Sequence, residues 1–214
     1  MSNVNLLIFG STGSLGLACK VLCQQKGWKV YEGYRQINAQ HWDVSFHGII
    51  WSQGVNLTSS FEDTSDEDWL SVFDANLFFV VKSLRSLMEH DLIHEGARLV
   101  IIGSVWEKLH RKNKSAYSTS KAAVSGLVRA LASDLGSRNI SVNCVSPGIV
   151  LNPMTSRNLS DKQIRNIELN TPGNRLVSPQ EVAKVVEFLV SEDSSGINGQ
   201  SIFVDNGWSD SHNV

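Results

Sequence analysis

A tyrosine and a lysine stand four residues apart in the segment SAYSTSKAAVSG, which begins at Ser115 and has a helical pattern. Tyr117 and Lys121 therefore lie one above the other on the same face of a helix. A free tyrosine is a poor acid or base near neutral pH because its pKa is about 10. A neighbouring ammonium group favours the phenolate, so such a pair is suited to giving and taking a proton.

A second candidate site is the glycine-rich turn in LLIFGSTGSLGLA, between an expected strand and an expected helix. Glycine lets the backbone turn tightly and lets a pyrophosphate approach the N-terminus of the helix that follows. A glycine-rich turn without a ligand is the alternative. The turn predicts a dinucleotide site that is formed by Gly10, Ser11, Thr12, Gly13, Ser14, Leu15 and Gly16.

The end of the next expected strand, in WKVYEGYR, bears on the choice of cofactor. In dinucleotide folds an acidic residue at this strand end binds the adenosine ribose, whereas an arginine accommodates a 2′-phosphate. Tyr34 and Arg35 occupy the strand end, and neither of them carries a carboxylate. We therefore predict that Arg35 binds the 2′-phosphate, which favours NADP(H) over NAD(H). A solvated arginine is the alternative interpretation.

The elements that must position these residues alternate between strand-like and helical patterns. Strands are expected in VNLLIF, WKVYEGY, HGIIWS, ARLVIIGS, ISVNCVSP and GQSIFVD. Helices are expected in SLGLACKVLCQQKG, DEDWLSVFDANLFFVVKSLRSLMEH, SAYSTSKAAVSGLVRALASDLGSR and SPQEVAKVVEFLVSE. The strands have few alternating polar positions, as expected when helices cover both faces of a sheet. This order predicts an α/β fold, a Rossmann-like doubly wound parallel sheet of about seven strands, in one domain over residues 1–214.

One connection between strands is too short for a helix of normal length. Only seven residues separate Arg35 from Asp43. The crossover helix between the second and third strands is therefore expected to be missing or reduced to a turn. Its absence would open the adenine end of the cofactor site to solvent.

The composition excludes several classes of protein. Apolar residues make up 42% of the 214 residues, and the net charge of −2 gives no reason to expect nucleic acid or an anionic membrane as a partner. No apolar run approaches the length of a membrane span, and the start of the chain lacks the features of a signal peptide. A cytoplasmic location is the expectation.

The sequence predicts no metal site. Cys19 and Cys23 share the face of an expected helix, but two further ligands are not in reach, so buried reduced thiols are the better interpretation. His90 and His94 also have helical spacing, with no third ligand evident. We interpret this pair as a solvated helix end.

Together these motifs resemble those of the short-chain dehydrogenase/reductase family, in particular members of the 3-oxoacyl-[acyl-carrier-protein] reductase kind. The similarity spans nearly the whole chain. YSTSK resembles the tyrosine–lysine signature, and Ser104 in IIGSV stands 13 residues before Tyr117, the usual separation in the family. Asn76 in FDANLFF matches the family's helix asparagine. The glycine turn is the cofactor motif in a variant spacing, with Ser14 where the commoner pattern has glycine.

The resemblance implies further cofactor-binding residues. Asp43 in DVS matches the segment that contacts adenine. IIWSQG resembles the asparagine-asparagine-alanine-glycine segment after the fourth strand, here changed to Trp51-Ser52-Gln53-Gly54. SPGIV matches the segment that lines the nicotinamide. The implied cofactor-binding set beyond the glycine turn is Arg35, Asp43, Ser52, Gln53, Gly54, Asn76, Tyr117, Lys121, Pro147, Gly148, Ile149 and Val150.

The mechanism that the resemblance implies is hydride transfer between nicotinamide and a carbonyl carbon. Tyr117 would give the proton to the carbonyl oxygen, and Ser104 would hydrogen-bond that oxygen. Lys121 would support the tyrosine and bind ribose hydroxyls, and Asn76 would hold a water that relays protons. The substrate class is a small carbonyl compound: a 3-oxoacyl thioester, a sugar-derived ketone or a small biosynthetic ketone. A catalytically idle dinucleotide sensor or scaffold protein is the alternative, which the altered WSQG segment and the missing crossover helix favour.

Two segments depart from the family pattern. VWEKLHRKNKSA carries Lys108, His110, Arg111, Lys112 and Lys114 where relatives have small and apolar residues. This cluster could attract an anionic substrate, and a solvated loop or a subunit contact is the alternative. Asn152 replaces the usual threonine, and residues 155–170 are expected to form a flap over the substrate. Relatives pair through their two long helices, which implies a homodimer or homotetramer.

Overall fold

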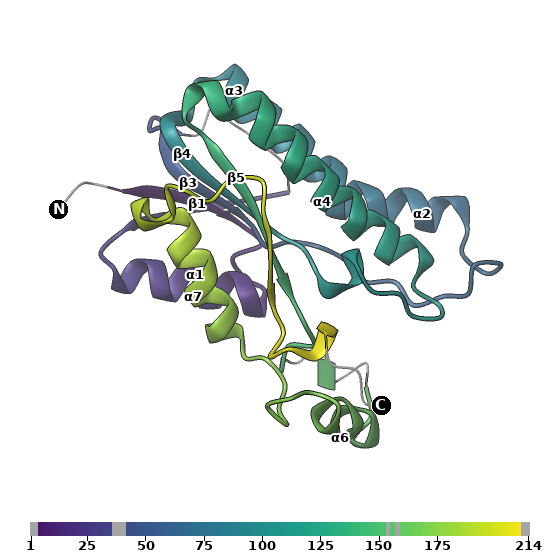
Figure 1. Cartoon of the computed structure of the whole chain (residues 1–214). Helices are drawn as coiled ribbons and strands as arrows, with labels where there is room; N and C mark the ends of the chain where they lie inside the picture. Colours follow the sequence, from purple (N-terminus) through teal and green to yellow (C-terminus); the bar gives the residue numbers. More distant parts are fainter. Residues whose placement is uncertain (1–3, 36–41, 153–154, 157–158, 211–214) are drawn as a thin grey trace.

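The computed structural model describes residues 4–35, 42–152, 155–156 and 159–210. A parallel sheet forms the centre, with the strand order β2-β1-β3-β4-β5-β6 (Figure 1). The strands are β1 (Asn5–Phe9), β2 (Lys29–Gly33), β3 (Phe46–Trp51), β4 (Ile93–Ile102), β5 (Ser141–Pro147) and β6 (Ser201–Val204). The order reverses between β1 and β3, as in doubly wound sheets, which confirms the Rossmann-like prediction. In the described part of the chain the sheet has six strands, one for each strand-like segment of the sequence, so the estimate of about seven was wrong.

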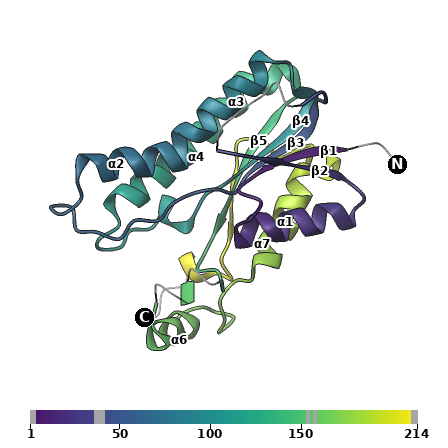
Figure 2. The same cartoon turned by 180° about the vertical axis from the view of Figure 1, so that it is seen from behind.

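Helices cover both faces of the sheet (Figures 1 and 2). α1 (Ser14–Gln25) and α7 (Pro179–Val190) pack together on one face. α2 (Asp66–Phe73), α3 (Phe79–Glu89) and α4 (Ser115–Leu135) cover the other, and α6 (Asp161–Leu169) lies beyond one end of the sheet. Strand β1 illustrates why both faces need a cover, because its side chains alternate between two buried clusters on opposite faces of the sheet. Leu6 and Ile8 pack on the α1 and α7 side, whereas Leu7 and Phe9 pack on the α3 and α4 side.

Local signals define the ends of the helices on the first face. α1 is followed by Gly27, whose φ of 80° is one that glycine adopts without strain. α7 begins at Pro179, after a capping box in which Ser178 and Glu181 satisfy each other's backbone N–H groups. Cys19 and Cys23 of α1 are buried and unpaired, as predicted, and burial raises the pKa of the Cys19 thiol to about 12.

The long helix expected over DEDWLSVFDANLFFVVKSLRSLMEH is interrupted. Between α2 and α3 the residues Asp74–Phe78 form a π-helical turn, and this turn contains Asn76. A π-helical turn takes one more residue than an α-helical turn, and such turns are frequent at functional sites. A pattern with a period of 3.6 residues does not reveal one insertion of this kind.

The expectation that His90 and His94 lie on the same helix was wrong. α3 ends at Glu89, and His94 lies in β4. Asp91 adopts a φ of 52°, so the chain leaves the helix axis before His94 is reached. The His94 ring stacks on the ring of His47 in β3, with centroids 4.3 Å apart.

The connection between β2 and β3 contains no helix in its described residues, 34–35 and 42–45. The remainder of this connection, residues 36–41, lies outside the described residues.

Across the described ranges, no helix combines the length and the apolar character that a membrane crossing requires.

Candidate active site

A cleft of about 650 Å³ opens at the carboxyl ends of the central strands. This position, at the reversal of strand order between β1 and β3, is the usual ligand site of open parallel sheets. Segments that follow four different strands form its walls, together with the first turns of α4. These segments are the glycine turn after β1, residues 52–58 after β3, residues 103–106 after β4 and residues 148–150 after β5.

The glycine turn has the shape of a phosphate cradle. Gly10 has a φ of 76°, and a Cβ atom there would lie 2.6 Å from the backbone nitrogen of Gln53. At Gly16 a Cβ atom would collide with the carbonyl oxygen of Gly10. Gly13 is the N-cap of α1 and has no side chain to cap the first N–H groups of the helix. These N–H groups suit a pyrophosphate, so the residues present fit a dinucleotide.

A carboxylate that the sequence analysis overlooked lies beside this turn. Glu32 of β2 accepts hydrogen bonds from the Ser11 hydroxyl and, at 2.7 Å, from Lys20 Nζ. The bond from Lys20, followed by the bond from Ser11, lowers the pKa of the Glu32 carboxyl group. Glu32 lies two residues before Tyr34, ahead of the strand end where such a carboxylate is expected, and its side chain reaches back to the turn.

The two residues predicted at the adenosine end do not line the cleft. Arg35 and Asp43 are exposed and lie on either side of residues 36–41, which are outside the described part. Ser11, Thr12 and Gly16 also lie outside the cleft lining. Of these, Ser11 and Gly16 are buried behind the turn, and Thr12 is exposed. The other predicted residues of the turn, Gly10, Gly13, Ser14 and Leu15, line the cleft.

The segment after β3 forms the next wall. Ser52 Oγ donates to the carbonyl oxygen of Phe9 at 2.7 Å, which fixes this segment to β1. Gln53 lines the cleft, and its buried Oε1 atom has no hydrogen-bond partner among the described residues. A Cβ atom at Gly54 would lie 3.0 Å from Asn76 Oδ1 and 3.6 Å from Lys121 Nζ. A side chain at Gly54 would therefore crowd Asn76, whereas its contact with Lys121 would be an ordinary one.

Asn76 lies beneath the cleft and does not line it. Its Oδ1 atom accepts from the Val55 N–H at 2.8 Å, and its Nδ2 atom donates to the Val55 carbonyl at 3.1 Å. Nδ2 also donates to Ser120 Oγ at 2.9 Å, and this hydroxyl donates to the Tyr117 carbonyl at 2.7 Å. The π-helical turn therefore joins the segment after β3 to helix α4.

Ser104, Tyr117 and Lys121 line the same cleft. Lys121 is 4% exposed, its Nζ atom donates to the Ile102 carbonyl at 2.9 Å, and this atom lies 5.9 Å from the centre of the Tyr117 ring. The Ser104 hydroxyl accepts from the Trp106 N–H at 3.3 Å, so its own proton can be donated to a ligand. The cleft thus brings together a phenol, an ammonium group and a hydroxyl donor.

Comparisons with known proteins place the chain in a family. A family model described as enoyl-(acyl carrier protein) reductase matches residues 12–209. Carbonyl reductase family member 4 of Danio rerio is 34% identical over 193 residues, which are 90% of this chain and 76% of that protein. The 3-oxoacyl-[acyl-carrier-protein] reductase FabG of Escherichia coli (strain K12) is 30% identical over 172 residues, 80% of this chain and 69% of that protein. The chain belongs to the short-chain dehydrogenase/reductase family.

The solved structure of a short chain dehydrogenase family protein from Francisella tularensis subsp. tularensis SCHU S4 has the same fold. It matches with a TM-score of 0.86 at 26% identity, over 98% of this chain and all of that chain. Some alignments with curated relatives span as little as 64% of the relative's length. The family consists of oxidoreductases that act on alcohol and carbonyl groups.

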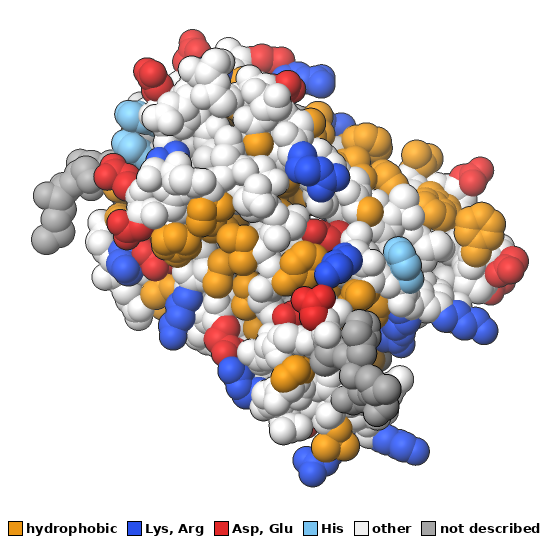
Figure 3. Space-filling view, viewed as in Figure 1, with side chains coloured by type: hydrophobic (Ala, Val, Ile, Leu, Met, Phe, Trp, Pro, Cys, Tyr) orange, Lys and Arg blue, Asp and Glu red, His pale blue; other side chains and the backbone are white. Residues whose placement is uncertain are grey.

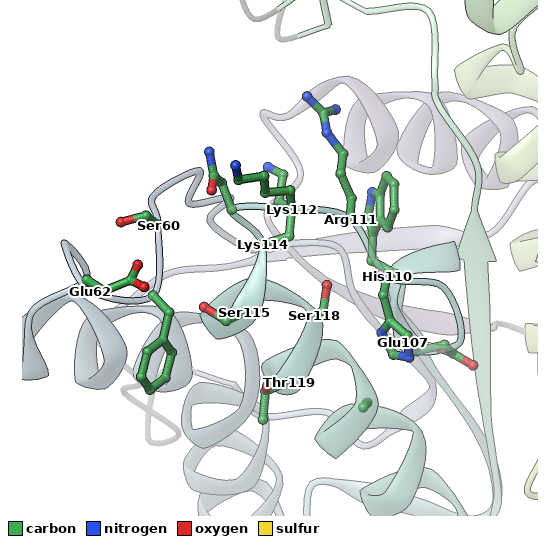
Figure 4. A pocket seen from close by; sticks show the side chains of 14 residues that line it. Ser60, Glu62, Glu107, His110, Arg111, Lys112, Lys114, Ser115, Ser118 and Thr119 are labelled. Atoms are coloured by element: carbon green, nitrogen blue, oxygen red, sulfur yellow. The ribbon is translucent and has the colours of Figure 1, made fainter.

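The basic segment of the chain is not uniformly solvated. Lys114 is 6% exposed, and its Nζ atom donates to Asn56 Oδ1, to the Leu57 carbonyl and to Thr58 Oγ1. Burial, with a smaller contribution from the charge of Arg111, lowers the pKa of Lys114 to about 8. Lys108 is exposed and pairs with Asp210 at 3.0 Å. Figure 4 shows Arg111, Lys112 and Lys114 above the start of α4, around a second pocket of about 480 Å³.

The last wall of the cleft comes from the segment after β5. Pro147, Gly148, Ile149 and Val150 line it, as do Asn152, Thr155 and Leu159. Asn152 Oδ1 accepts from the Thr155 N–H at 2.9 Å, so this asparagine stabilises the turn that follows it. Residues 157–158 of the expected flap lie outside the described residues, and its remainder contains α6.

The sequence analysis missed several residues at this site. Trp106 lines the cleft and contacts Trp208 edge to face, with ring centroids 5.8 Å apart. Val55, Asn56 and Thr58 also line it, because the segment after β3 turns along the cleft. No local pattern announces these positions. In the described ranges, no three His, Cys, Asp or Glu side chains are grouped as a metal site would require.

Proposed function

We propose that residues 1–214 form one NADP(H)-dependent oxidoreductase domain that interconverts a carbonyl compound and its alcohol. The observation that carries the proposal is the cleft in which Ser104, Tyr117 and the buried Lys121 face a phosphate cradle. A scaffold protein would have no need for a buried ammonium group beside a phenol at the mouth of such a cradle. The site would thus supply the proton donor, the hydrogen-bond donor and the cofactor seat that the reaction requires.

The cofactor would lie across the carboxyl ends of the strands. The glycine turn and the first N–H groups of α1 would hold its pyrophosphate, and residues 147–150 would lie along the nicotinamide. When bound, the nicotinamide supplies or accepts the hydride. The preference for NADP(H) rests on Arg35, and it is supported by Glu32, whose carboxylate is already bonded to Ser11 and Lys20.

The residues of the chain would handle the proton. Tyr117 would donate its hydroxyl proton to the carbonyl oxygen and take it back in the reverse direction. Ser104 would donate a hydrogen bond to the same oxygen. Lys121 would hold a ribose hydroxyl while its charge favours the phenolate form of the tyrosine. Asn76 would set the distance between the segment after β3 and α4, and we propose that it also orders the water of the relay.

The substrate is proposed to be anionic. Arg111 and Lys114 line the cleft, and positive charge at a cleft raises the local concentration of an anion. The relative from Escherichia coli bears the name of a 3-oxoacyl-[acyl-carrier-protein] reductase, so a 3-oxoacyl thioester is the first substrate class to test. Sugar-derived and small biosynthetic ketones are the other two.

We also propose that the chain forms a homodimer or homotetramer. Phe61, Leu70 and Phe78 are exposed by 69%, 65% and 43% on the side of the molecule formed by α2 and α4. Figure 3 shows apolar side chains gathered on this side. Large exposed apolar side chains of this kind mark contact surfaces. Sedimentation would determine the state, and a cytoplasmic location stays a prediction.

The first experiment is a titration of the protein with NADPH and, separately, with NADH, followed by quenching of the six tryptophans. Acetoacetyl-CoA is then added, and loss of NADPH absorbance is recorded. Binding of NADPH with carbonyl-dependent oxidation is expected. Binding of neither nucleotide would contradict the proposal and would favour a scaffold protein.

A further inference from the structure

We propose that Lys114 is a positioning residue for the reaction proposed above. It fixes the segment Asn56–Thr58 against the start of α4 and places a second positive charge beside Tyr117. The inference rests on the proposed oxidoreductase function, because Tyr117 is its proton donor. No pattern in the sequence distinguishes Lys114 from the exposed Lys112 two residues earlier.

The first step is the hydrogen bonding of the ammonium group. An ammonium group has three N–H donors, and those of Lys114 have three acceptors, one from each of Asn56, Leu57 and Thr58. Lys114 is also the N-cap residue of α4. One side chain thereby connects three consecutive residues of the segment after β3 to the helix that carries Tyr117.

The second step is that the same segment is held from another direction. Val55 is bonded through both its N–H and its carbonyl to Asn76 of the π-helical turn. Val55, Asn56 and Thr58 all line the cleft. Two buried polar side chains, one from the π-helical turn and one from the N-cap residue of α4, therefore fix one wall of the site. A site held in this way is set for reaction without a search through conformations.

The third step is the charge. Lys114 Nζ lies 5.5 Å from the centre of the Tyr117 ring, and Lys121 Nζ lies at 5.9 Å. Both distances are within the range at which a cation interacts with an aromatic ring, about 6 Å. Among the described residues no carboxylate forms an ion pair with Lys114. Its charge is therefore not neutralised, and a positive charge at this distance stabilises a phenolate.

The surroundings of Lys114 determine when this charge is present. Burial and the charge of Arg111 lower its pKa to about 8, whereas its oxygen acceptors act in the opposite sense because they stabilise the ammonium form. Four other ionisable groups line the smaller pocket with Lys114: His110 and Lys112 of the same loop, Glu62 and Glu107 (Figure 4). Tyr117 and Lys121 of α4 line the larger cleft with it. Glu107 is engaged elsewhere, since its Oε2 atom accepts from Ser146 Oγ at 2.7 Å.

The test uses Lys114→Met, which keeps most of the side-chain volume but removes the charge and the donors. Lys114→Arg keeps the charge, and Lys184→Met is the control, an exposed lysine on the far face in α7. The first readout is the ultraviolet absorbance of phenolate as the pH rises. Subtracting the titration of Tyr117→Phe isolates one of the three tyrosines. The second readout is kcat and KM for acetoacetyl-CoA and NADPH against pH, and thermal unfolding shows whether each variant is folded.

In Lys114→Met we expect less phenolate than in wild type at pH values below about 8, where Lys114 carries its charge, and we expect kcat to fall about tenfold. We expect wild type to lose activity as the pH rises through about 8, where Lys114 gives up its proton, and we expect this loss to be absent from the variant. Lys114→Arg should keep the phenolate signal of wild type, and Lys184→Met should match wild type in every readout.

The proposal is overturned if Lys114→Met loses thermal stability while its phenolate signal and pH profile stay as in wild type, because this outcome describes a purely structural lysine. If Lys114→Met does not fold, loss of the wild-type phenolate signal in folded Lys114→Arg would also overturn it. Absence of turnover in wild type would instead reject the proposed reaction, and the phenolate titration would still decide the role of Lys114.

Discussion

The hydroxyl of Ser11 donates to the carboxylate of Glu32, which joins the turn after β1 to the strand β2. Lys20 of α1 bonds the same carboxylate at 2.7 Å. An acidic residue at the end of this strand commonly accepts from the adenosine ribose of NAD. Here the carboxylate is already bonded to two donors of the protein, so Glu32 helps to shape the turn and leaves Arg35 as the candidate for the 2′-phosphate.

The first prediction concerns the choice of cofactor. Arg35→Asp should weaken NADPH binding by about ten- to hundredfold, because a charge-assisted hydrogen bond contributes about 1.5–3 kcal/mol. NADH binding should change little, as fluorescence titration would show. Glu32→Gln serves as the contrasting variant, and it should weaken both nucleotides alike through the turn. Equal losses for both nucleotides in Arg35→Asp would remove the 2′-phosphate assignment.

The second prediction concerns the proton donor. Tyr117→Phe should lower kcat by about 10²–10⁴-fold, the usual contribution of general acid catalysis. NADPH affinity should stay within about twofold, because the lost hydroxyl is not part of the phosphate cradle. Steady-state kinetics with acetoacetyl-CoA, together with the fluorescence titration, checks both statements. Substantial reductase activity in this variant would show that another group supplies the proton.

The third prediction concerns the π-helical turn. Asn76→Ala should destabilise the protein by about 2–4 kcal/mol, since it leaves the N–H and the carbonyl of Val55 without partners. The measurement is urea unfolding, with Asn166→Ala on the exposed surface of α6 as the matched control. The segment 55–58 should also become more accessible to proteases. Unfolding midpoints that agree between the two variants would show that water replaces the lost bonds.

The fourth prediction concerns stability at mildly acidic pH. Burial, followed by the charge of His94, lowers the pKa of His47 below its usual value, and Glu192 opposes this only in part. The unfolded chain therefore binds more protons than the folded chain between the lowered pKa and about 6.5, so stability rises with pH through this window. This contribution to stability is lost as the pH falls, because protonation of His47 Nδ1 would break the hydrogen bond that it accepts from the Asn5 N–H.

The measurement for this prediction is the midpoint of urea unfolding across that window. His47→Gln should flatten the dependence, whereas His110→Gln, in an exposed position, should leave it as in wild type. A slope that is equal in all three proteins would assign the effect to other groups.

The fold could be predicted because its signals are local and repeated. Leu6, Leu7, Ile8 and Phe9 are consecutive apolar residues, a pattern typical of a strand that is buried on both faces. Gly27 gave the end of α1 in the same way. The π-helical turn could not be predicted, because one inserted residue shifts the helical phase without changing the residue types. The strand position of His94 depended on the φ of Asp91, which no composition reveals.

The site could be predicted where residues from one element act together, as for Tyr117 and Lys121, which are one helical turn apart. The roles of Glu32 and Lys114 could not be predicted, because their contacts are distant in the sequence. Glu32 bonds Ser11, 21 residues away, and Lys114 bonds a segment about 57 residues away. Sequence indicated a charged loop around Lys114, and burial makes that lysine different from its neighbours. Arg35 and Asp43 stay predictions, since the residues between them lie outside the described ranges.

The π-helical turn between α2 and α3 makes the helix less regular, and it places Asn76 under the cleft. If one residue were deleted between Asp74 and Phe78, α2 and α3 could join as an unbroken α-helix, and a regular helix is the more stable form. Each side chain beyond the deletion would then rotate by about 100° relative to α2, which would take Asn76 away from Val55 or α3 away from its core contacts. A regular helix at this position would therefore disrupt the wall of the cleft. Selection for thermal stability and selection for turnover should therefore both reject the deletion, although it would make the helix itself more regular.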